Sequence, residues 1–397
     1  MALRHAGALR RGTKTLLEAI ELAVGIPGGA DLWGRELLED ATRESLGREY
    51  NGDSKEATFF VNARARPDRY LRALASRPSS FAAVAEGELV AARLPGSALS
   101  PGVIHRSEVA GIARKAERLE APPESLFRGY WDLVESNGLA VAEQAGHFAD
   151  SLALPDAVDV KGPPSNLRIE GTAEVEKYVA FDTRPGPIVV EKGAIIESFS
   201  RITGPAYVGA DTKLHSALVE GGTSVFEVCN VGGQVESSVI MAHTNKAHEG
   251  YVGHAYVGEW TNLGAGSTFS NLKNTYGNVR VELPEGRRDS GMLKLGPAVG
   301  DMCKISIGAL VYAGKLVGTG SHVSGLASHS VPSFTHFDGF TGRMVELRLE
   351  SVLETQRRMM ERRGRTPTRA LEELIRRAFK ATAADRRRAK VKAGKIG

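Results

Sequence analysis

A six-residue repeat of apolar side chains restricts the fold of this chain more than any other feature of its sequence. An α-helix repeats about every 3.6 residues and an isolated strand about every two, so neither element produces this spacing. A coil with three short strands per turn does, because each side points one apolar residue inward before the chain turns a corner. The repeat runs through Val190, Ile196, Ile202, Val208 and Leu214; through Tyr251, Val257, Leu263 and Phe269; and through Leu293, Val299, Ile305, Val311, Val317 and Val323.

Small residues follow these apolar positions where the corners of such a coil would lie. Gly209 comes directly after Val208, and Gly264 directly after Leu263. Glycine relieves the backbone at a tight turn. It supplies 45 of the 397 residues, more than the roughly 7% of average proteins. The segment from about Pro187 to Phe334 is therefore predicted to be a parallel β-helix of hexapeptide repeats.

Two interruptions of this coil are expected. One is an irregular stretch near residues 222–248. The other is a polar segment from Leu272 to Gly291, which is interpreted as a loop projecting from the coil. Long loops on rigid solenoids often carry function, although a tolerated insertion is an equally good interpretation of this one.

The segments on either side of the coil have the spacing of helices and short strands. They suggest a small α/β unit before the coil and a helical pair after it. The chain is thus predicted to be mainly β, with an α/β domain and linker over residues 1–165, the β-helix over 166–335, and C-terminal helices with a basic tail over 336–397. The predicted helices are Thr15–Leu22, Trp33–Leu46, Leu126–Asn137 ending at Gly138, Arg343–Arg363 and Thr368–Arg387, and the predicted strands are Ala57–Ala63 and Gly87–Leu94.

Composition and charge favour an ordinary globular protein. Hydrophobic residues make up 42% of the chain and charged residues 25%. No run of about 18 apolar residues could span a bilayer and no export signal is recognised, so the chain is expected to be cytoplasmic. The net charge of +4 comes largely from the tail, where basic residues alternate with apolar ones as on an exposed helix face, and neither nucleic acid nor membrane is expected as a partner. Cys229 and Cys303 are predicted to be buried, without a disulfide or zinc.

The segment from Asn245 to Asn274, NKAHEGYVGHAYVGEWTNLGAGSTFSNLKN, is where chemistry is most strongly indicated. His248 and Tyr251 stand close together, and Asn262 and Asn271 follow on later sides of the coil. Residues one coil turn apart can meet on one surface. An imidazole has an ordinary pKa of about 6.5 and can accept a proton near neutral pH. The other interpretation of His248 is a structural residue that caps one side of the coil.

This segment resembles the acetyltransferase half of the GlmU-like bifunctional sugar-1-phosphate nucleotidylyltransferase/amino-sugar-1-phosphate acetyltransferase family. Further stretches, such as GEWTNLGA, FRGYWDLVESNG and ETQRRMMERRG, are similar to the sugar nucleotidyltransferase branch of that family. The resemblance therefore covers most of residues 125–390, and it implies a left-handed coil. The family motif is matched at Lys246, Ala247, His248, Tyr251, Gly253, Asn262, Gly264, Ala265, Gly266 and Asn271.

The resemblance implies an activity and a role for each matched residue. The activity is transfer of the acetyl group of acetyl-CoA to the amine of an amino-sugar-1-phosphate, for nucleotide-sugar synthesis, in a homotrimer whose acetyl-CoA lies between neighbouring coils. Acetyl transfer requires no metal, and Mg²⁺ would be needed only if the N-terminal domain acted on nucleotides. The implied general base is His248, the implied substrate contacts are Lys246, Tyr251, Asn262, Asn271 and Lys273, and the implied acetyl-CoA contacts are Ala265, Ser306 and Gly325.

Several features depart from the family pattern. The position of its phosphate-binding lysine is Gly277, with Lys273 as a possible substitute, and a second basic position aligns with Ser237. The substrate phosphate would thus meet fewer cations. His243, His254, His322 and His329 lack comparable neighbours in the sequence and are expected to be structural or exposed.

The N-terminal part is predicted to be an incomplete or degenerate nucleotidyltransferase domain. It lacks the loop Gly-x-Gly-x-Arg, and Gly25 to Gly34 is too irregular to replace it, so no nucleotide-binding residue is assigned. Two alternatives stay open. One is a sugar-1-phosphate nucleotidylyltransferase whose coil is an oligomerisation scaffold, and the other is a non-catalytic hexapeptide scaffold.

Overall fold

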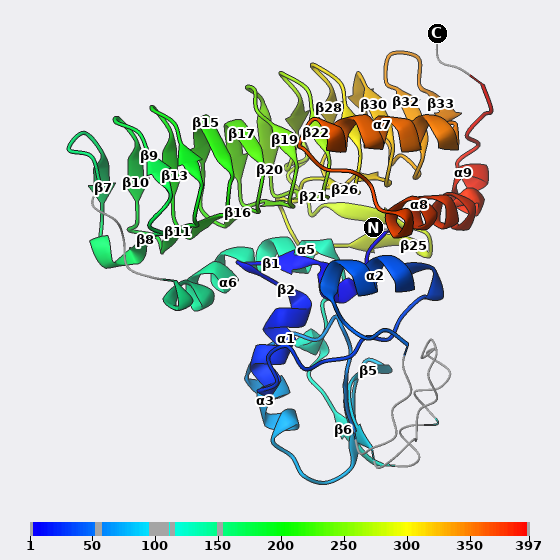
Figure 1. Ribbon diagram of the computed structural model, residues 1–397. Helices are drawn as coiled ribbons and strands as arrows, with labels where there is room; N and C mark the ends of the chain where they lie inside the picture. Colours follow the sequence, from blue (N-terminus) through cyan, green and yellow to red (C-terminus); the bar gives the residue numbers. More distant parts are fainter. Residues whose placement is uncertain (1–2, 52–57, 95–110, 112–115, 149–153, 395–397) are drawn as a thin grey trace.

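The computed structural model describes residues 3–51, 58–94, 111, 116–148 and 154–394, and its centre is a long parallel β-helix (Figure 1). No helix in these ranges is long and apolar enough to cross a membrane. An eight-stranded parallel sheet forms one face of the coil. Its strands are β8 (Leu167–Ile169), β11 (Ile188–Val190), β14 (Ala206–Val208), β16 (Thr223–Val225), β18 (Val239–Ile240), β21 (Tyr256–Val257), β26 (Ala298–Val299) and β29 (Leu316–Val317).

The other two faces share one larger sheet, because β15 and β17 bend around the corner between them. The face that carries the candidate site runs through β7 (Asp159–Lys161), β10 (Ala180–Asp182), β13 (Arg201–Thr203), the ends of β15 (Lys213–Val219) and β17 (Asn230–Glu236), β20 (Tyr251–Gly253), β23 (Thr268–Phe269), β28 (Leu310–Val311) and β31 (Leu326–Ala327). The third face runs through β9 (Glu174–Val175), β12 (Ile195–Ile196), the starts of β15 and β17, β19 (Asn245–Lys246), β22 (Asn262–Leu263), β27 (Lys304–Ile305), β30 (His322–Ser324) and β32 (Thr335–Asp338).

Columns of aliphatic side chains fill the coil and confirm the predicted β-helix. On the eight-stranded face, one column joins Val190, Val208, Val225, Ile240, Val257, Val299 and Val317 through successive strand pairs. Each of these side chains is at most 2% exposed. Cys229 and Cys303 belong to the same apolar core, as predicted.

The structure corrects the predicted pattern in three places. Val252 rather than Tyr251 is the inward residue of β20, and Leu293 lies outside the core with 47% of its surface exposed. The stretch 222–248 continues the coil as β16 to β19 instead of interrupting it. Its inward residues Val231, Val235 and Ile240 are spaced by four and five residues rather than six, which hides the repeat in the sequence.

The segment from Leu272 to Gly291 does leave the coil, as predicted. It contains the antiparallel hairpin of β24 (Arg280–Leu283) and β25 (Gly286–Asp289). An isolated bridge between Leu272 and Lys294 closes its base, so the chain re-enters the coil near the point where it left. The loop therefore returns Lys294 to the neighbourhood of β20 and β23.

The N-terminal unit contains a mixed four-stranded sheet in the order β3-β5-β4-β6, with helices beside it (Figure 1). Helix α1 starts at a capping box in which Thr15 and Glu18 exchange hydrogen bonds. The elements are η1 (Ala6–Ala8), β1 (Arg10–Arg11), β2 (Lys14–Thr15), α1 (Leu16–Val24), η2 (Glu36–Leu38), α2 (Glu39–Leu46), β3 (Thr58–Val61), α3 (Arg69–Ala75), β4 (Phe81–Ala85), β5 (Glu88–Leu94), β6 (Glu117–Glu120), η3 (Pro123–Ser125), α5 (Tyr130–Glu135), α6 (Asn137–Gln144), η4 (Ala145–His147) and η5 (Pro164–Asn166).

Two predicted helices of this unit differ from the observed ones. The helix predicted from Trp33 begins only at η2 and α2. The helix predicted over Leu126–Asn137 is observed as α5, which begins at Tyr130 and ends at Glu135, and Gly138 lies in the first turn of a second helix, α6, that begins at Asn137. A Cβ at Gly138 would lie 3.1 Å from the Gly222 Cα, so glycine allows the helix and the coil to approach closely.

The N-terminal unit and the C-terminal helices cover much of the coil. Outward side chains of the eight-stranded sheet, including Tyr207 and Tyr256, pack with Trp131 of α5 in one apolar cluster. The C-terminal helices pack against the corner that holds Trp260 and Phe334. These elements are β33 (Arg343–Glu346), α7 (Leu349–Glu361), α8 (Arg369–Ala381) and α9 (Ala383–Arg388).

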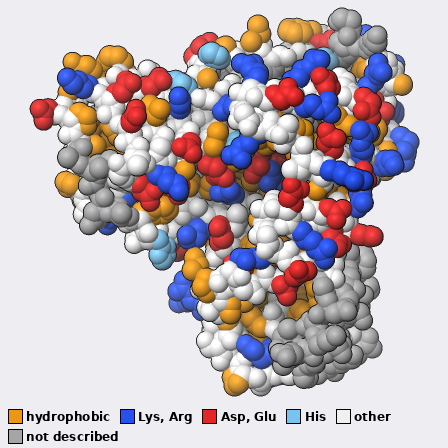
Figure 2. Space-filling view, viewed as in Figure 1, with side chains coloured by type: hydrophobic (Ala, Val, Ile, Leu, Met, Phe, Trp, Pro, Cys, Tyr) orange, Lys and Arg blue, Asp and Glu red, His pale blue; other side chains and the backbone are white. Residues whose placement is uncertain are grey.

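The prediction of a helix from Arg343 is wrong at its start. Residues 343–346 form the strand β33, which pairs with β32 in antiparallel fashion, and the helix α7 begins only at Leu349. Figure 2 shows basic and acidic side chains intermingled over the C-terminal helices. Arg357, for example, pairs with both Glu354 and Glu372. The basic tail thus carries acidic partners along its helices.

Candidate active site

His248 lies at an uncovered corner of the coil, between β19 and β20. Its side chain is exposed. The Gly266 amide on the next coil turn donates to the Glu249 carbonyl at 3.0 Å, which places Ala265 and Gly266 beside the His248 corner. The Gly308 amide donates in turn to the Ala265 carbonyl at 2.8 Å. A single edge of the coil therefore carries His248 and, on the following turns, the residues that the family resemblance assigns to acetyl-CoA.

Tyr251 and Asn271 are brought together in a polar network on the adjoining face. The Tyr251 hydroxyl donates to Glu236 Oε2 at 2.6 Å and accepts from Asn271 Nδ2 at 2.7 Å. Asn271 Nδ2 also donates to His254 Nδ1 at 2.9 Å. On the opposite side of the carboxylate, Lys294 Nζ lies 3.4 Å from Glu236 Oε1.

Gly253 explains why the Tyr251 side chain can lie flat along this face. A Cβ at position 253 would lie 2.2 Å from the Tyr251 hydroxyl oxygen and 2.6 Å from Asn271 Nδ2. Such distances are impossible for a real side chain, so an alanine would force Tyr251 out of the network. The glycine of the family motif therefore has a structural reason in this chain.

Burial and charge fix the protonation of the network. Burial, together with the bond to Glu236, raises the pKa of the Tyr251 hydroxyl, which therefore remains a donor. Burial would raise the pKa of Glu236, but the Tyr251 hydrogen bond, the Lys294 charge and the charge that His254 carries when protonated at lower pH outweigh burial and lower that pKa. Burial lowers the pKa of His254. The network thus contains a carboxylate, a neutral phenol and a neutral imidazole near pH 7.

Asn262 and Lys273 stand apart from this network. Asn262 lies on β22, on the third face, where its Oδ1 accepts from Asn245 Nδ2 at 3.0 Å. Lys273 directs its ammonium to the Asn278 carbonyl at 2.6 Å, within the projecting loop. Their predicted substrate contacts remain predictions, since neither shares a bond with Tyr251 or Asn271.

Lys246 points into the coil instead of toward its surface. It pairs with Val231 in a column of inward side chains and is only 1% exposed. Its Nζ donates to the carbonyls of Gly232 and His248, both at 2.7 Å. The structure therefore corrects the prediction that Lys246 contacts substrate, and its ammonium instead ties the His248 backbone to the preceding coil turn.

The buried ammonium makes stability depend on pH in a defined direction. Burial lowers the pKa of Lys246 from 10.5 to about 8. Between these values the unfolded chain binds one more proton than the folded chain, so the free energy of unfolding rises with pH, by up to about 1.4 kcal/mol per unit. Lys246→Met should lack this contribution. Denaturant midpoints of both proteins at pH 7.5 and 9.5 test it, and an equal pH response in the two would contradict it.

The residues predicted to contact acetyl-CoA differ in accessibility. Ser306 is exposed and Ala265 partly exposed on the His248 edge. Gly325 is buried beneath the turn that follows β32, where a Cβ would lie 3.1 Å from the Phe340 nitrogen. Ala265 and Ser306 therefore fit a ligand that lies along the edge, whereas Gly325 supports the turn that ends this edge.

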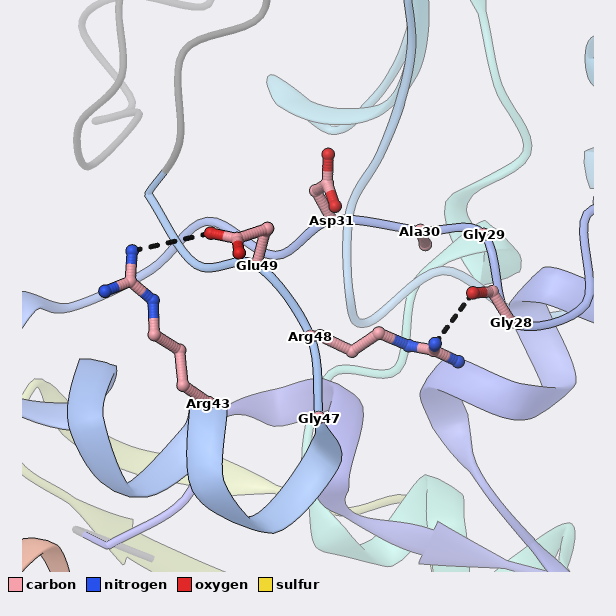
Figure 3. Close-up of a pocket in the computed structure, with 8 residues that line it drawn as sticks. All are labelled: Gly28, Gly29, Ala30, Asp31, Arg43, Gly47, Arg48 and Glu49. Atoms are coloured by element: carbon pink, nitrogen blue, oxygen red, sulfur yellow. Dashed lines mark hydrogen bonds and ion pairs between the residues drawn. The ribbon is translucent and has the colours of Figure 1, made fainter.

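The glycine-rich stretch of the N-terminal unit lines a surface hollow of about 390 Å³ (Figure 3). Its backbone amides are already used, because those of Gly28 and Ala30 donate to the Glu21 carboxylate, both at 3.0 Å. Arg48 donates to the Gly28 carbonyl at 2.7 Å. These amides are turned toward an internal carboxylate, which gives a physical reason for assigning no phosphate-binding loop here.

Three members of the network were not predicted from the sequence. Glu236 faces Gly253 across the β17–β20 pairing, so the strand register would have revealed it. Its neighbour Ser237, which aligns with a basic residue of the family, is not part of the network, because its hydroxyl donates to the Gly221 carbonyl. His254 lies between the motif residues Gly253 and Asn262, although the sequence predicts a structural or exposed histidine there, and the return of the projecting loop brings Lys294 to the network.

The chain is 30% identical over 191 residues, 47% of each chain, to a bifunctional sugar-1-phosphate nucleotidylyltransferase/acetyltransferase of Sulfurisphaera tokodaii. The chain is similar to the GlmU-like bifunctional proteins. A bifunctional protein GlmU of Sorangium cellulosum is 26% identical over 337 residues, 80% of this chain and 66% of the relative. The chain thus spans from about half to somewhat under two thirds of these two relatives.

No family model matches the chain. Among solved structures, a UDP-N-acetylglucosamine acyltransferase of Francisella novicida aligns at 13% identity over 59% of this chain and 76% of that chain, with a TM-score of 0.28.

Proposed function

We propose that this protein transfers the acetyl group of acetyl-CoA to the amine of an amino sugar, with the amino-sugar-1-phosphates of the resembled family as the first acceptors to test. The observation that carries the proposal is the position of His248. It is exposed at an edge shared with Ala265 and Ser306, and it lies three residues along the chain from Tyr251, which belongs to a partly buried polar network. In the proposed arrangement, the base His248 stands between an edge that would bind acetyl-CoA and a surface that would bind the acceptor.

In the proposed reaction His248 acts as general base. The amine nitrogen attacks the thioester carbonyl and forms the C–N bond, while the C–S bond breaks. The imidazole takes the proton that the nitrogen loses, and the departing thiolate of CoA takes up a proton. Most of the acceleration would come from holding amine and thioester together, with proton removal adding about 10²-fold to 10⁴-fold.

The proposal includes a homotrimer, in which acetyl-CoA would lie between neighbouring coils. A single chain supports this idea in one respect. Asn262 lies on the third face of the coil and Tyr251 on the site face, on opposite sides of the edge that carries His248. In a trimer, the Asn262 of one coil could therefore face the Tyr251 network of the neighbouring coil.

The direct test is release of CoA thiol by the purified protein from acetyl-CoA, with glucosamine, galactosamine and their 1-phosphates as acceptors. Acceptor-dependent release supports the proposal. No release with any acceptor would reject it in favour of the nucleotidylyltransferase or scaffold alternatives.

Gly253→Ala should raise the KM for the acceptor about tenfold, the effect of losing one or two hydrogen bonds. The added methyl group displaces the Tyr251 hydroxyl, whereas the fold should persist because only the end of a side chain must move. Gly171→Ala is the matched control, since a Cβ there meets no atom within 4 Å among the described residues. An unchanged KM in Gly253→Ala would remove Tyr251 from acceptor binding.

A further inference from the structure

The ammonium of Lys246 lies where the coil otherwise places apolar side chains. Lys246 is only 1% exposed, and its two bonds go to backbone carbonyls rather than to a carboxylate. A buried charge costs free energy that an aliphatic side chain at the same position would avoid. The lysine therefore has a role other than filling the interior. The other members of its inward column are Ile196, Leu214, Val231, Leu263, Ile305, Val323 and Phe337.

The corner at residues 247–250, which presents the proposed base, is closed differently from the next two corners of the same edge. On the following turns, the Ser267 amide donates to the Gly264 carbonyl at 3.1 Å and the Ala309 amide to the Ser306 carbonyl at 3.2 Å. Within the described chain, no such amide–carbonyl bond spans residues 247–250. This corner thus needs another group to hold its backbone.

The Lys246 ammonium takes the place of that bond. From inside the coil it donates to the His248 carbonyl and to the Gly232 carbonyl of the preceding turn, both at 2.7 Å. Hydrogen bonds from a charged donor are stronger than those between neutral groups. From the following turn, the Gly266 amide holds the neighbouring Glu249 carbonyl at 3.0 Å. The corner is therefore held from both adjoining turns, and Lys246 supplies the contact to His248 itself.

We infer that Lys246 is a positioning residue for acetyl transfer, because its buried ammonium fixes the His248 backbone, and thereby the place of the imidazole, without touching either substrate. This inference rests on the proposed function and adds a residue to it. Misplacing a catalytic group by about 1 Å can cost on the order of 10²-fold in rate. Loss of the ammonium should therefore lower kcat, whereas the KM values should change little because other residues form the binding surfaces.

The first experiment measures kcat and KM for Lys246→Met, which removes both bonds and keeps an unbranched side chain. Its kcat should fall about tenfold or more, with both KM values within about twofold of wild type. Lys246→Gln keeps one neutral donor and should lose less. Circular dichroism with a thermal melt confirms that each variant is folded, and Lys246→Gln replaces Lys246→Met if the latter does not fold.

Lys304→Met is the matched control. The Lys304 ammonium also donates to two coil carbonyls, those of Trp260 at 3.3 Å and Met302 at 2.9 Å, but at the corner covered by the C-terminal helices. This variant should keep the wild-type kcat. An equal loss of kcat in the two methionine variants would mean that both lysines act only through stability, and it would overturn the inference, as would an unchanged kcat in Lys246→Met.

Amide hydrogen exchange without substrates separates this inference from the proposed function. The Gly266 amide, bound to the Glu249 carbonyl, should exchange about tenfold faster or more in Lys246→Met than in wild type, and at the wild-type rate in Lys304→Met. That result, without acetyl transfer by the wild-type protein, would reject the proposed function and uphold the hold of Lys246 on the corner. An unchanged exchange rate in Lys246→Met would overturn the inference even if the protein transfers acetyl groups.

Discussion

His248→Ala is expected to lower acetyl transfer by about 10²-fold or more while leaving the fold intact. The rate falls because the attacking amine loses the base that takes its proton, a contribution typically worth 10²-fold to 10⁴-fold. The fold persists because the His248 side chain is exposed at a corner of the coil. Steady-state thiol release measures the rate, and circular dichroism with a thermal melt measures the fold.

A second exposed histidine provides the control. His329 also lies at the surface of the coil, where its Nδ1 is 3.0 Å from the Ser328 hydroxyl. His329→Ala should keep the wild-type rate, so the histidine-dependent loss would be specific to position 248. If His248→Ala turned over as fast as wild type, the imidazole would have no part in the mechanism and His248 would be structural.

Val311→Asp should unfold the coil, with a loss of about 4 kcal/mol or more in the free energy of unfolding. Val311 is 1% exposed and stands between Phe269 and Ala327 in a column of inward side chains. A carboxylate there has no polar partner in the column and must either stay charged in an apolar interior or become protonated at a cost. Guanidinium unfolding followed by circular dichroism measures the loss.

A substitution at Leu310, the neighbouring residue of the same strand, tests whether the loss at Val311 comes from burying a carboxylate or from introducing an aspartate anywhere in β28. Leu310 points outward from β28 and is 44% exposed. Leu310→Asp makes a similar change in the same strand and should cost no more than about 1 kcal/mol, as surface substitutions usually do. Equal losses in the two variants would mean that the inward column does not stabilise the coil.

The coil could be predicted from the sequence because its interior accepts one aliphatic residue per side, and a spacing of six follows from that geometry. The prediction was wrong where this geometry changes. Sides of four and five residues through Val231, Val235 and Ile240 break the spacing although the columns continue. Gly138 resembled a helix end because close packing against Gly222 leaves no local mark in the sequence.

The candidate site could be predicted only in part. The motif correctly joined Tyr251 and Asn271, which lie on adjacent coil turns. Glu236 and Lys294 were missed because strand register and the return of a loop bring them to the site from distant parts of the sequence. Lys246 was assigned to the surface because a lysine in an inward column contradicts the pattern that identified the coil.

The network of Glu236, Tyr251 and Asn271 takes one side chain from each of three successive coil turns. Adjoining strands lie about 4.8 Å apart, so the spacing of the coil turns fixes the distances between these three side chains and thereby the length of a ligand that could contact all of them. Each turn of a solenoid contacts mainly its neighbours. Whole turns could therefore be gained or lost at either end of the coil during evolution without changing the spacing of the side chains on these three turns.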